Sequence, residues 1–182
     1  MANNVYALQL AKELNLTVIG GIGLNIYNNF TVGYLSNIFV DFTYYYSLEL
    51  NLKEIWYDDN GYIYSEGIIP IMTLCHCPIQ LNTTCDCAHC KYIDINYVDK
   101  TGSVFKIARK QLTKCYFNIL NCVPISCIHK YGRQQNVVVN LVDSSVSKQI
   151  IDNVERLKSG KKCDIIYSNN RFTTGHLYRG VK

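Results

Sequence analysis

The chain has 182 residues, of which 48% are hydrophobic, a combination typical of a globular protein with one core. Its formal net charge of +4, from 18 basic and 14 acidic residues, neither requires nor excludes a nucleic-acid partner. No apolar run approaches the roughly 18 residues that cross a bilayer, and the first residues lack the features of a secretory signal. We therefore expect a cytoplasmic protein with no membrane partner, in which thiols bind metal and the nine cysteines do not form disulfides.

The first 74 residues predict alternating helices and strands. An apolar stripe with helical spacing runs from Val5 to Leu14, and the glycines at 20–23 mark a tight turn. The predicted helices span residues 5–14, 29–37 and 53–57. The predicted strands span residues 16–19, 38–42 and 68–73. Such alternation is typical of parallel βα units.

Residues 75–115 are rich in cysteine and carry few helix signals, so we expect a metal-bearing insertion there. The insertion contains a predicted β-hairpin, with strands at 92–98 and 104–108 joined by a turn at 99–102. This interruption separates the first βα units from those that follow.

The alternation resumes with a predicted strand at 137–142 and a helix whose apolar face runs from Val146 to Leu157. Ser144 or Ser145 is the expected cap of that helix, and Gly160 its expected end. We therefore predict a single domain. Its parts are βα units in 1–74, a cysteine-rich cluster-binding segment in 75–130, and a final βα unit with a tail in 131–182.

Four of the nine cysteines combine a Cys-x2-Cys pair with one thiol upstream and one downstream. They are Cys77, Cys87, Cys90 and Cys115. Thiolates suit an iron–sulfur cluster or zinc better than magnesium or calcium. The spacing leaves an iron–sulfur cluster, structural zinc and plain buried cysteines open, although a zinc ribbon usually has a second Cys-x2-Cys pair. Cys122, Cys127 and Cys163, the last on a predicted strand, are expected to pack as small core residues.

Polar residues near the predicted carboxyl ends of strands are candidates for a pocket. Asn25 and Asn28 follow the glycines at 20–23, which lack both the G-x-G-x-x-G spacing and the G-K-[ST] ending of phosphate-binding loops. The sequence leaves open whether the two asparagines line the pocket. Glu49 has apolar neighbours in SLEL, so it is either paired structurally or placed to move protons.

The carboxyl-terminal tail is basic and contains the segment TTGHLYRG. Residues 156–182 hold seven Lys or Arg against one acid, Asp164, which indicates either a solvated surface or a mouth that attracts an anionic substrate or RNA phosphates. His176 and Arg179 either lie in a solvated tail or fold back, so that Arg179 grips a carboxylate or phosphate. No H-E-x-x-H or G-x-S-x-G motif supports a zinc metalloprotease or a serine hydrolase.

Segments along essentially the whole chain resemble, in order, the motifs of the peptidase U32 family, also called collagenase-like proteases. These segments are GLNIYNN (23–29), SLELNLKEI (47–55), EGIIPIMTLCHCPI (66–79), CAHC (87–90), KCYFNILNCVPI (114–125) and FTTGHLYRGV (172–181). The chain is similar to the second half of the family's catalytic domain. Its departures include Ile68 in place of a common arginine, and additional thiols at Cys75 and Cys85.

The resemblance implies an α/β fold: a partial (β/α)8 TIM-barrel-like domain, about its second half, with a cysteine-rich insertion and a β-hairpin. The family includes putative proteases and oxygen-independent hydroxylases of RNA bases (ribosomal or transfer RNA) or of a quinone precursor. The hydroxylases carry a [4Fe–4S] cluster, and prephenate is implicated as their oxygen donor. The resemblance places Cys77, Cys87, Cys90 and Cys115 at the cluster-ligand positions.

We therefore expect an iron–sulfur-dependent enzyme of the RNA-base hydroxylase type, or a truncated remnant of one. Glu49 and His176 are the expected catalytic residues, and Asn25, Asn28 and Arg179 are the expected substrate-binding residues. Two alternatives remain. One is a U32 peptidase that hydrolyses peptide bonds, for which the sequence offers no nucleophile–base pair. The other is a catalytically inactive half-domain that needs an N-terminal half-domain as its partner.

Overall fold

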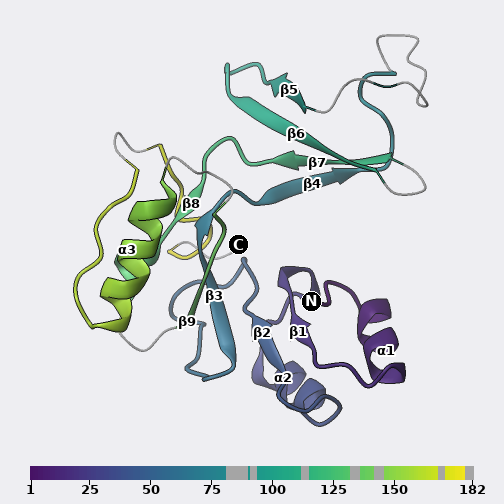
Figure 1. Ribbon diagram of the computed structural model, residues 1–182. Helices are drawn as coiled ribbons and strands as arrows, with labels where there is room; N and C mark the ends of the chain where they lie inside the picture. Colours follow the sequence, from purple (N-terminus) through teal and green to yellow (C-terminus); the bar gives the residue numbers. More distant parts are fainter. Residues whose placement is uncertain are drawn as a thin grey trace. The chain divides into compact units, whose positions relative to one another are not determined.

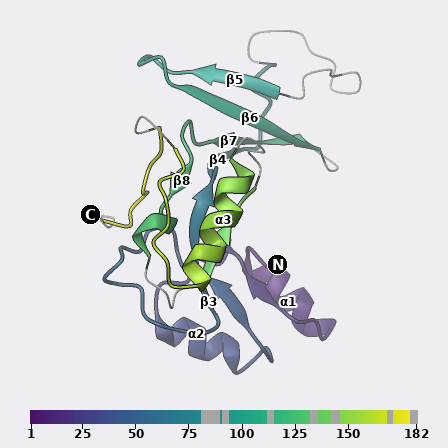
Figure 2. The same ribbon diagram turned by 60° about the vertical axis from the view of Figure 1, so that its left-hand side comes forward.

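The structure is a computed structural model that describes residues 1–80, 90, 94–111, 115–131, 136–141, 146–167 and 171–178. The chain forms two compact units (Figure 1 and Figure 2). Unit 1 combines Met1–Gly67 with Ile125–Lys182, and unit 2 is the continuous segment Ile68–Pro124. Within the described ranges, no helix has both the length and the apolar character that a membrane crossing requires.

Unit 1 is built on a small, mainly parallel sheet. Its strands are β1 (Ile19–Gly20), β2 (Thr43–Tyr45), β3 (Gly61–Gly67), β8 (Ile125–Ser126) and β9 (Asn136–Val139). The strands β1, β2, β3 and β9 run parallel and pair in chain order, so that β3 lies between β2 and β9. The short strand β8 pairs antiparallel with Glu66 and Gly67 at the end of β3. The parallel strands, with α-helices in the same unit, confirm the expected α/β class at a coarse level.

The helices of unit 1 have clear local signals. They are α1 (Val5–Glu13), α2 (Asn29–Ser36) and α3 (Ser147–Lys158), with the short 3-10 turns η1 (Ile22–Leu24) and η3 (Ile128–Lys130). Asn4 Oδ1 caps α1 by accepting the amide hydrogen of Ala7 at 2.8 Å, and Asn28 Oδ1 caps α2 by accepting that of Thr31 at 2.9 Å. After α3, Gly160 has a φ of +68°, as a helix-ending glycine should. The expected positions of these helices are confirmed.

Aromatic side chains from β2 and its neighbours form the main core of unit 1. Tyr44 is completely buried and stacks on Phe42, with ring centroids 5.9 Å apart. Tyr46 meets Trp56 edge-on at 5.0 Å, and its hydroxyl donates to the Trp56 carbonyl at 2.6 Å. The buried members of this core are Ala2, Leu8, Val18, Ile26, Leu35, Phe39, Phe42, Tyr44, Tyr46, Leu50 and Ile63. Because the rings of β2 are locked in this core, the position of the chain that leaves β2 at Ser47 is fixed.

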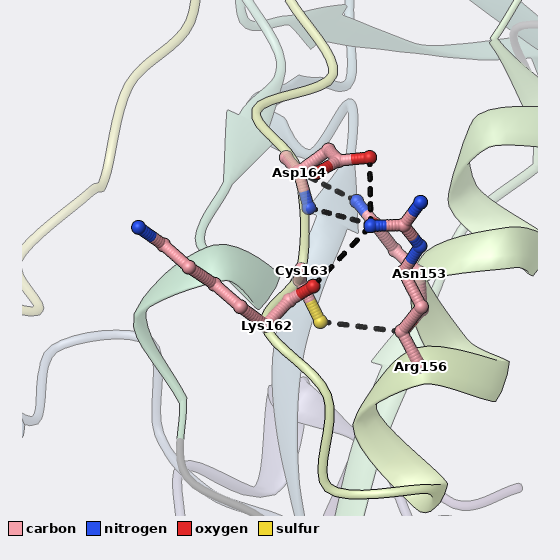
Figure 3. Close-up of polar contacts among 5 residues, drawn as sticks. All are labelled: Asn153, Arg156, Lys162, Cys163 and Asp164. Carbon is pink, nitrogen blue, oxygen red and sulfur yellow. Dashed lines mark hydrogen bonds and ion pairs between the residues drawn. The ribbon is translucent and has the colours of Figure 1, made fainter.

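Polar contacts hold the segment after α3 against the helix (Figure 3). Asn153, which is buried, donates from Nδ2 to the Asp164 carbonyl and accepts the Asp164 amide hydrogen at Oδ1, both at 2.8 Å. Arg156 forms an ion pair with Asp164 at 3.0 Å. Cys163 is buried, and its thiol donates to the Asn153 carbonyl at 3.3 Å, which confirms it as a small core residue. The strand expected around Cys163 is wrong, because a side-chain amide rather than a second strand pairs with this backbone.

Unit 2 is an antiparallel sheet in the order β4–β7–β6–β5. Its strands are β4 (Pro70–Leu74), β5 (Asp94–Val98), β6 (Val104–Gln111) and β7 (Cys115–Leu120). The β5–β6 hairpin confirms the expected one. Asp99 shapes its turn by accepting the amide hydrogens of Thr101 at 2.8 Å and Ser103 at 2.9 Å, and Gly102 supplies a φ of +82°.

Several predicted elements differ from the structure. The strands expected at 16–19 and 38–42 are displaced to β1 and β2, because sheet pairing rather than the apolar run decides which residues extend. The helix expected at 53–57 is wrong. The Trp56 carbonyl there is bonded to the Tyr46 hydroxyl in the core rather than to a helix amide. So short a helix also has little intrinsic stability.

The last predicted βα unit is largely confirmed. The strand expected at 137–142 appears as the shorter β9, and the helix with its apolar face is α3, in which Ile150 and Leu157 are buried. Ser144 and Ser145, the expected caps of this helix, lie outside the described residues.

Candidate functional site

Unit 1 contains a small cavity lined by residues that directly follow β2 and by Ile63 and Tyr64 in the middle of β3. About 30 Å³ inside it is open to the centres of water molecules, which is room for one or two waters. The polar residues that line the cavity include Ser47, Tyr64, Cys127, Tyr131, Thr174 and His176. In open α/β sheets, ligands usually bind beyond the carboxyl ends of the strands, and the residues after β2 that line this cavity lie there, so we take these side chains as the candidate site of unit 1.

Ser47 connects this cavity to a hydrogen-bond network that contains two of the predicted site residues. Its hydroxyl donates to Asn25 Oδ1 and accepts the Glu49 amide hydrogen at 3.2 Å. The Tyr27 hydroxyl donates to Glu49 Oε2, and this bond raises the pKa of Tyr27. The structure therefore brings Asn25 and Glu49 together through Ser47, a residue that the sequence reading did not select. Both Asn25 and Glu49 are exposed, whereas Ser47 is buried.

The Ser47 hydroxyl is not arranged as a nucleophile. Its proton points to the amide oxygen of Asn25, which is not a base that can remove a proton. His176 lines the same cavity, but the hydrogen bond to Asn25 occupies the hydroxyl proton that a histidine base would need. This contact gives no support to serine-type hydrolysis.

Asn28, a predicted substrate-binding residue, lies at the start of α2. Its Oδ1 accepts hydrogen bonds from the amide and the hydroxyl of Thr31, at 2.9 and 3.1 Å. The extended backbone of Asn28 is that of an N-cap residue. These contacts show that Asn28 caps α2. Asn28 is not among the residues that line the cavity.

The C-terminal segment 171–178 folds onto unit 1. Thr173 forms a parallel bridge with Ile125, and its carbonyl accepts the Ser126 amide hydrogen at 3.0 Å. The Leu177 carbonyl accepts the Leu52 amide hydrogen at 2.7 Å, and the Leu177 side chain is buried. This segment places His176 on the cavity wall. Arg179, the predicted anion-binding residue, lies outside the described residues.

Glu66 is the ionisable residue that the sequence reading missed. It lies near the end of β3 and is completely buried. Its Oε1 accepts the Ser126 hydroxyl at 3.2 Å, the Cys127 amide hydrogen at 3.1 Å and the Ile128 amide hydrogen at 2.9 Å. Its Oε2 is buried as well and has no hydrogen-bond partner among the described residues. We call Glu66, Ser126, Cys127 and Tyr131 the Glu66 cluster.

Burial controls the ionisation of the Glu66 cluster. It raises the pKa of Glu66 from 4.5 to about 7, although the hydrogen bonds from Ile128, Ser126 and Cys127 act in the opposite direction. Burial also raises the pKa of the Cys127 thiol to about 12, with the charge of Glu66 as a second cause. Burial is also the main cause that raises the pKa of Tyr131. At neutral pH the cysteine and the tyrosine are therefore neutral, and the glutamate is poised to titrate.

Sequence did contain a signal for Glu66. The segment GYIYSEG contains the consecutive residues Tyr62, Ile63 and Tyr64, and such aromatic and β-branched residues are enriched in strands. The turn residues Asp58–Gly61 were interpreted as the end of the helix predicted at 53–57, and no strand was predicted after them. A strand can nevertheless begin directly after such a turn. A glutamate close to the carboxyl end of a parallel strand would then have been a candidate acid–base residue.

Three of the four predicted cluster ligands have backbones that the structure describes, and all three belong to unit 2. Cys77 lies three residues after the end of β4, and Cys115 is the first residue of β7. Leu74 of β4, Phe117 of β7 and Arg109 of β6 are neighbours in one row across the sheet. Arg109 Nη1 donates to the Cys90 carbonyl at 3.4 Å. The segments that carry Cys77, Cys90 and Cys115 therefore leave the same end of the sheet.

The thiol quartet itself is only partly described. Cys87, together with the neighbouring Cys85, lies outside the described residues, and so does the side chain of Cys115. Within the described part of the chain, no group of three or more His, Cys, Asp or Glu is placed to hold a metal ion. The donor chemistry of four thiolates fits a soft metal centre.

Of the remaining described cysteines, two are buried and two are exposed. Cys127 is 1% exposed and Cys163 is 6% exposed, which confirms both as core residues. The expectation for Cys122 is wrong, because it lies exposed after β7, where the chain has left the sheet. Cys75, directly after β4, is exposed as well.

No family model, no curated protein and no solved structure matches this chain. The function must therefore be argued from its own residues.

Proposed function

We propose that the chain is an iron–sulfur-dependent enzyme of the RNA-base hydroxylase type, with Cys77, Cys87, Cys90 and Cys115 as cluster ligands. The observation that supports it best is in unit 2, where the β4 end, the β7 start and the Arg109-bound Cys90 backbone share one end of the sheet. A cage of four thiolates needs ligands from separate chain segments. The sheet register supports the proposal because it brings the backbone segments that carry Cys77, Cys90 and Cys115 to one end of the sheet.

The chemistry of the cysteines favours a cluster over hard cations. Four thiolates are the usual ligand set of a [4Fe–4S] cluster, which supplies electron transfer or organises a substrate pocket. Structural zinc is the alternative metal for the same ligands. Either metal would tie the ends of β4 and β7 together and stabilise the cysteine-rich part of unit 2.

The substrate class rests on the resemblance to the peptidase U32 family and on charge. The excess of basic residues in 156–182 suits ribosomal or transfer RNA, or a small anionic co-substrate such as prephenate. In the same proposal, the parallel strands of unit 1 belong to a partial (β/α)8 barrel that an N-terminal half-domain completes. Glu49 and His176 then act as acid–base residues, and Asn25 and Arg179 contact the substrate.

The first test is chemical analysis of protein purified without oxygen. Iron and acid-labile sulfide in stoichiometric amounts are expected, and both should fall sharply in Cys77→Ser and Cys90→Ser. Cys122→Ser is the matched control, because this thiol is exposed and lies outside the quartet. Stoichiometric zinc without sulfide would support structural zinc instead of the iron–sulfur cluster. Absence of both metals would overturn the proposal.

The second test concerns the reaction. The iron-loaded protein, with prephenate and without molecular oxygen, should add one oxygen atom to a base of ribosomal or transfer RNA, detected by nucleoside mass spectrometry. A parallel gelatin digestion tests peptide-bond hydrolysis, which the direction of the Ser47 hydroxyl disfavours. If only an added N-terminal half-domain restores the RNA reaction, the chain is the inactive half of a split enzyme.

A further inference from the structure

We propose that unit 1 binds a small organic cation of the methylated-ammonium class in a second cavity, which we call the aromatic cavity. The described residues that line it are Tyr46, Ile55, Trp56, Tyr57, Asp58, Gly61, Ile63 and Asn136. All of them belong to unit 1, and none is a predicted metal ligand, catalytic residue or substrate-binding residue. The proposal therefore goes beyond the proposed function and does not depend on it.

The aromatic cavity has room for a ligand of a few heavy atoms. About 150 Å³ inside it is open to the centres of water molecules, compared with about 30 Å³ in the first cavity. Since one buried water needs roughly 10 to 15 Å³ on this measure, the space holds several waters or one small ligand. At Gly61 an added Cβ would lie 2.6 Å from Tyr46 Cε2, so a glycine here lets the Tyr46 ring lie close to the start of β3.

Three aromatic side chains contribute to the wall. The rings of Tyr46 and Trp56 meet at 82° with their centroids 5.0 Å apart, and the Tyr46 hydroxyl donates to the Trp56 carbonyl at 2.6 Å. The Tyr57 side chain is exposed, and its hydroxyl donates to Asp59 Oδ1. These contacts hold the rings in place without a ligand. Aromatic faces carry negative electrostatic potential, and rings that enclose a space are the usual cage for a methylated ammonium group.

Asp58 adds a negative charge to the same wall. Its Oδ2 accepts the Tyr44 hydroxyl at 2.9 Å, and its Oδ1 accepts the Asn60 amide hydrogen at 2.8 Å. The two bonds fix the carboxylate, and each oxygen keeps acceptor capacity because a carboxylate oxygen has two lone pairs. No lysine or arginine is among the described residues that line the cavity, so the charge of this wall is negative. A positively charged ligand therefore suits it better than a neutral or negative one.

The chemistry of the wall selects among cations. A hard metal ion prefers several oxygen ligands, whereas much of this wall is aromatic or aliphatic carbon. An unmethylated ammonium is a compact and strongly hydrated charge, so it loses more hydration on entering such a space. A methylated ammonium has a diffuse charge and an apolar surface. It can contact the rings and remain near the Asp58 carboxylate at the same time.

Titration of the full chain with choline, followed by NMR, tests the proposal. Trp56 is the one tryptophan of the sequence, so its indole N–H gives a single resonance that reports directly on this cavity. A saturable shift of that resonance is expected with choline. The uncharged isostere 3,3-dimethyl-1-butanol has the same shape without the charge and should bind at least about tenfold more weakly. Equal affinity for the two compounds, or no saturable shift with choline, would overturn the proposal.

Variants of the wall place the ligand. Tyr57→Leu keeps an apolar side chain but removes an aromatic face, and it should weaken choline binding about two- to fivefold. Tyr34→Leu is the matched control, because Tyr34 is 68% exposed and Tyr57 67%, and Tyr34 lies on α2 outside the cavity. Choline affinity that is unchanged in Tyr57→Leu would contradict binding in this cavity.

Asp58→Asn tests the contribution of charge. It keeps an acceptor oxygen for the Tyr44 hydroxyl and removes the negative charge, so choline should bind about tenfold more weakly, while 3,3-dimethyl-1-butanol should be little affected. An equal loss for both compounds would mean that the carboxylate does not recognise the cation. Tyr57→Leu changes an exposed side chain, so the proposal can be tested even if Asp58→Asn fails to fold. Iron content should be the same in all these variants, which separates this test from that of the cysteines.

Discussion

Glu66 accepts the backbone amide hydrogen of Ile128 at 2.9 Å, although 62 positions separate the two residues in the sequence. The bond joins the end of β3 to the start of η3, and Ile128 itself is completely buried. One buried carboxyl thus holds together the two parts of unit 1 that lie before and after unit 2.

The stability of the protein should depend on the ionisation of Glu66. Its pKa is about 7 in the folded chain and 4.5 for an ordinary glutamate, so the folded state binds the proton more tightly. The resulting stabilisation is complete below about pH 4.5 and is lost as the pH rises through 7. The loss amounts to about 3 kcal/mol of unfolding free energy. Urea unfolding at several pH values between 4 and 8 measures it.

Glu66→Gln keeps the shape of the side chain and removes the ionisation, so it should flatten this part of the pH profile. Glu49→Gln is the control, because it removes an exposed carboxyl and should leave the profile close to that of the wild type. Equal slopes in the wild type and Glu66→Gln would show that the buried carboxyl does not control stability.

Asn28 should behave as a helix cap. Asn28→Ala removes the acceptor for the Thr31 amide hydrogen and should cost about 1 kcal/mol of unfolding free energy. Asn28→Ser and Asn28→Asp keep an acceptor oxygen and should remain near the wild type. Chemical denaturation compares the three variants. If all three were equally stable, the cap would be energetically unimportant, and a role of Asn28 in binding would regain support.

Docking of the C-terminal segment should depend on Leu177. Its side chain is 7% exposed, and Leu177→Ala should cost about 2 to 4 kcal/mol because it leaves a gap beside the cavity. Hydrogen exchange should accelerate at the amides of Leu52 and Ser126, which donate to carbonyls of this segment. Tyr178→Ala is the control, because Tyr178 is 52% exposed and should affect these amides little. Unchanged exchange in Leu177→Ala would mean that the segment is not anchored by its apolar side chain.

Two glycines should respond in opposite directions to alanine. Gly67 has a φ of +119°, and an added Cβ would lie 2.6 Å from the Asn140 Cβ, so Gly67→Ala should cost at least about 2 kcal/mol. Gly33 lies in α2 with open space around it, and Gly33→Ala should gain about 1 kcal/mol through helix propensity. Thermal unfolding of both variants checks the pair. A Gly67→Ala protein as stable as the wild type would show that the end of β3 can relax.

Elements with strong local patterns could be predicted from the sequence. The apolar stripe of α1, the amphipathic face of α3 and the Asp99–Gly102 turn each depend on residues close together in the chain. The strand β3 has only a short local pattern, and its extended state depends on pairing with β2 and with β9, which lies far away in the sequence.

The candidate site likewise contains some residues that the local sequence indicates and others that only the folded structure reveals. Asn25 and Glu49 were selected from their positions after predicted strands, and the structure links them through Ser47. Glu66 was not selected, because its unusual pKa arises from burial and from donors that follow it by about 60 residues. Asn28 was selected for the pocket, although an asparagine directly before a predicted helix is also a capping signal.

The pairing of Gly67 with Ile125 has a consequence for how the chain can be cut and rejoined. The segment Ile68–Pro124 is an insertion in unit 1, and the residues before and after it, Gly67 and Ile125, are paired neighbours in the sheet. A short reverse turn can therefore replace the inserted segment without stretching the backbone of unit 1. The inserted segment is continuous in sequence, so it can be expressed separately or grafted onto another hairpin.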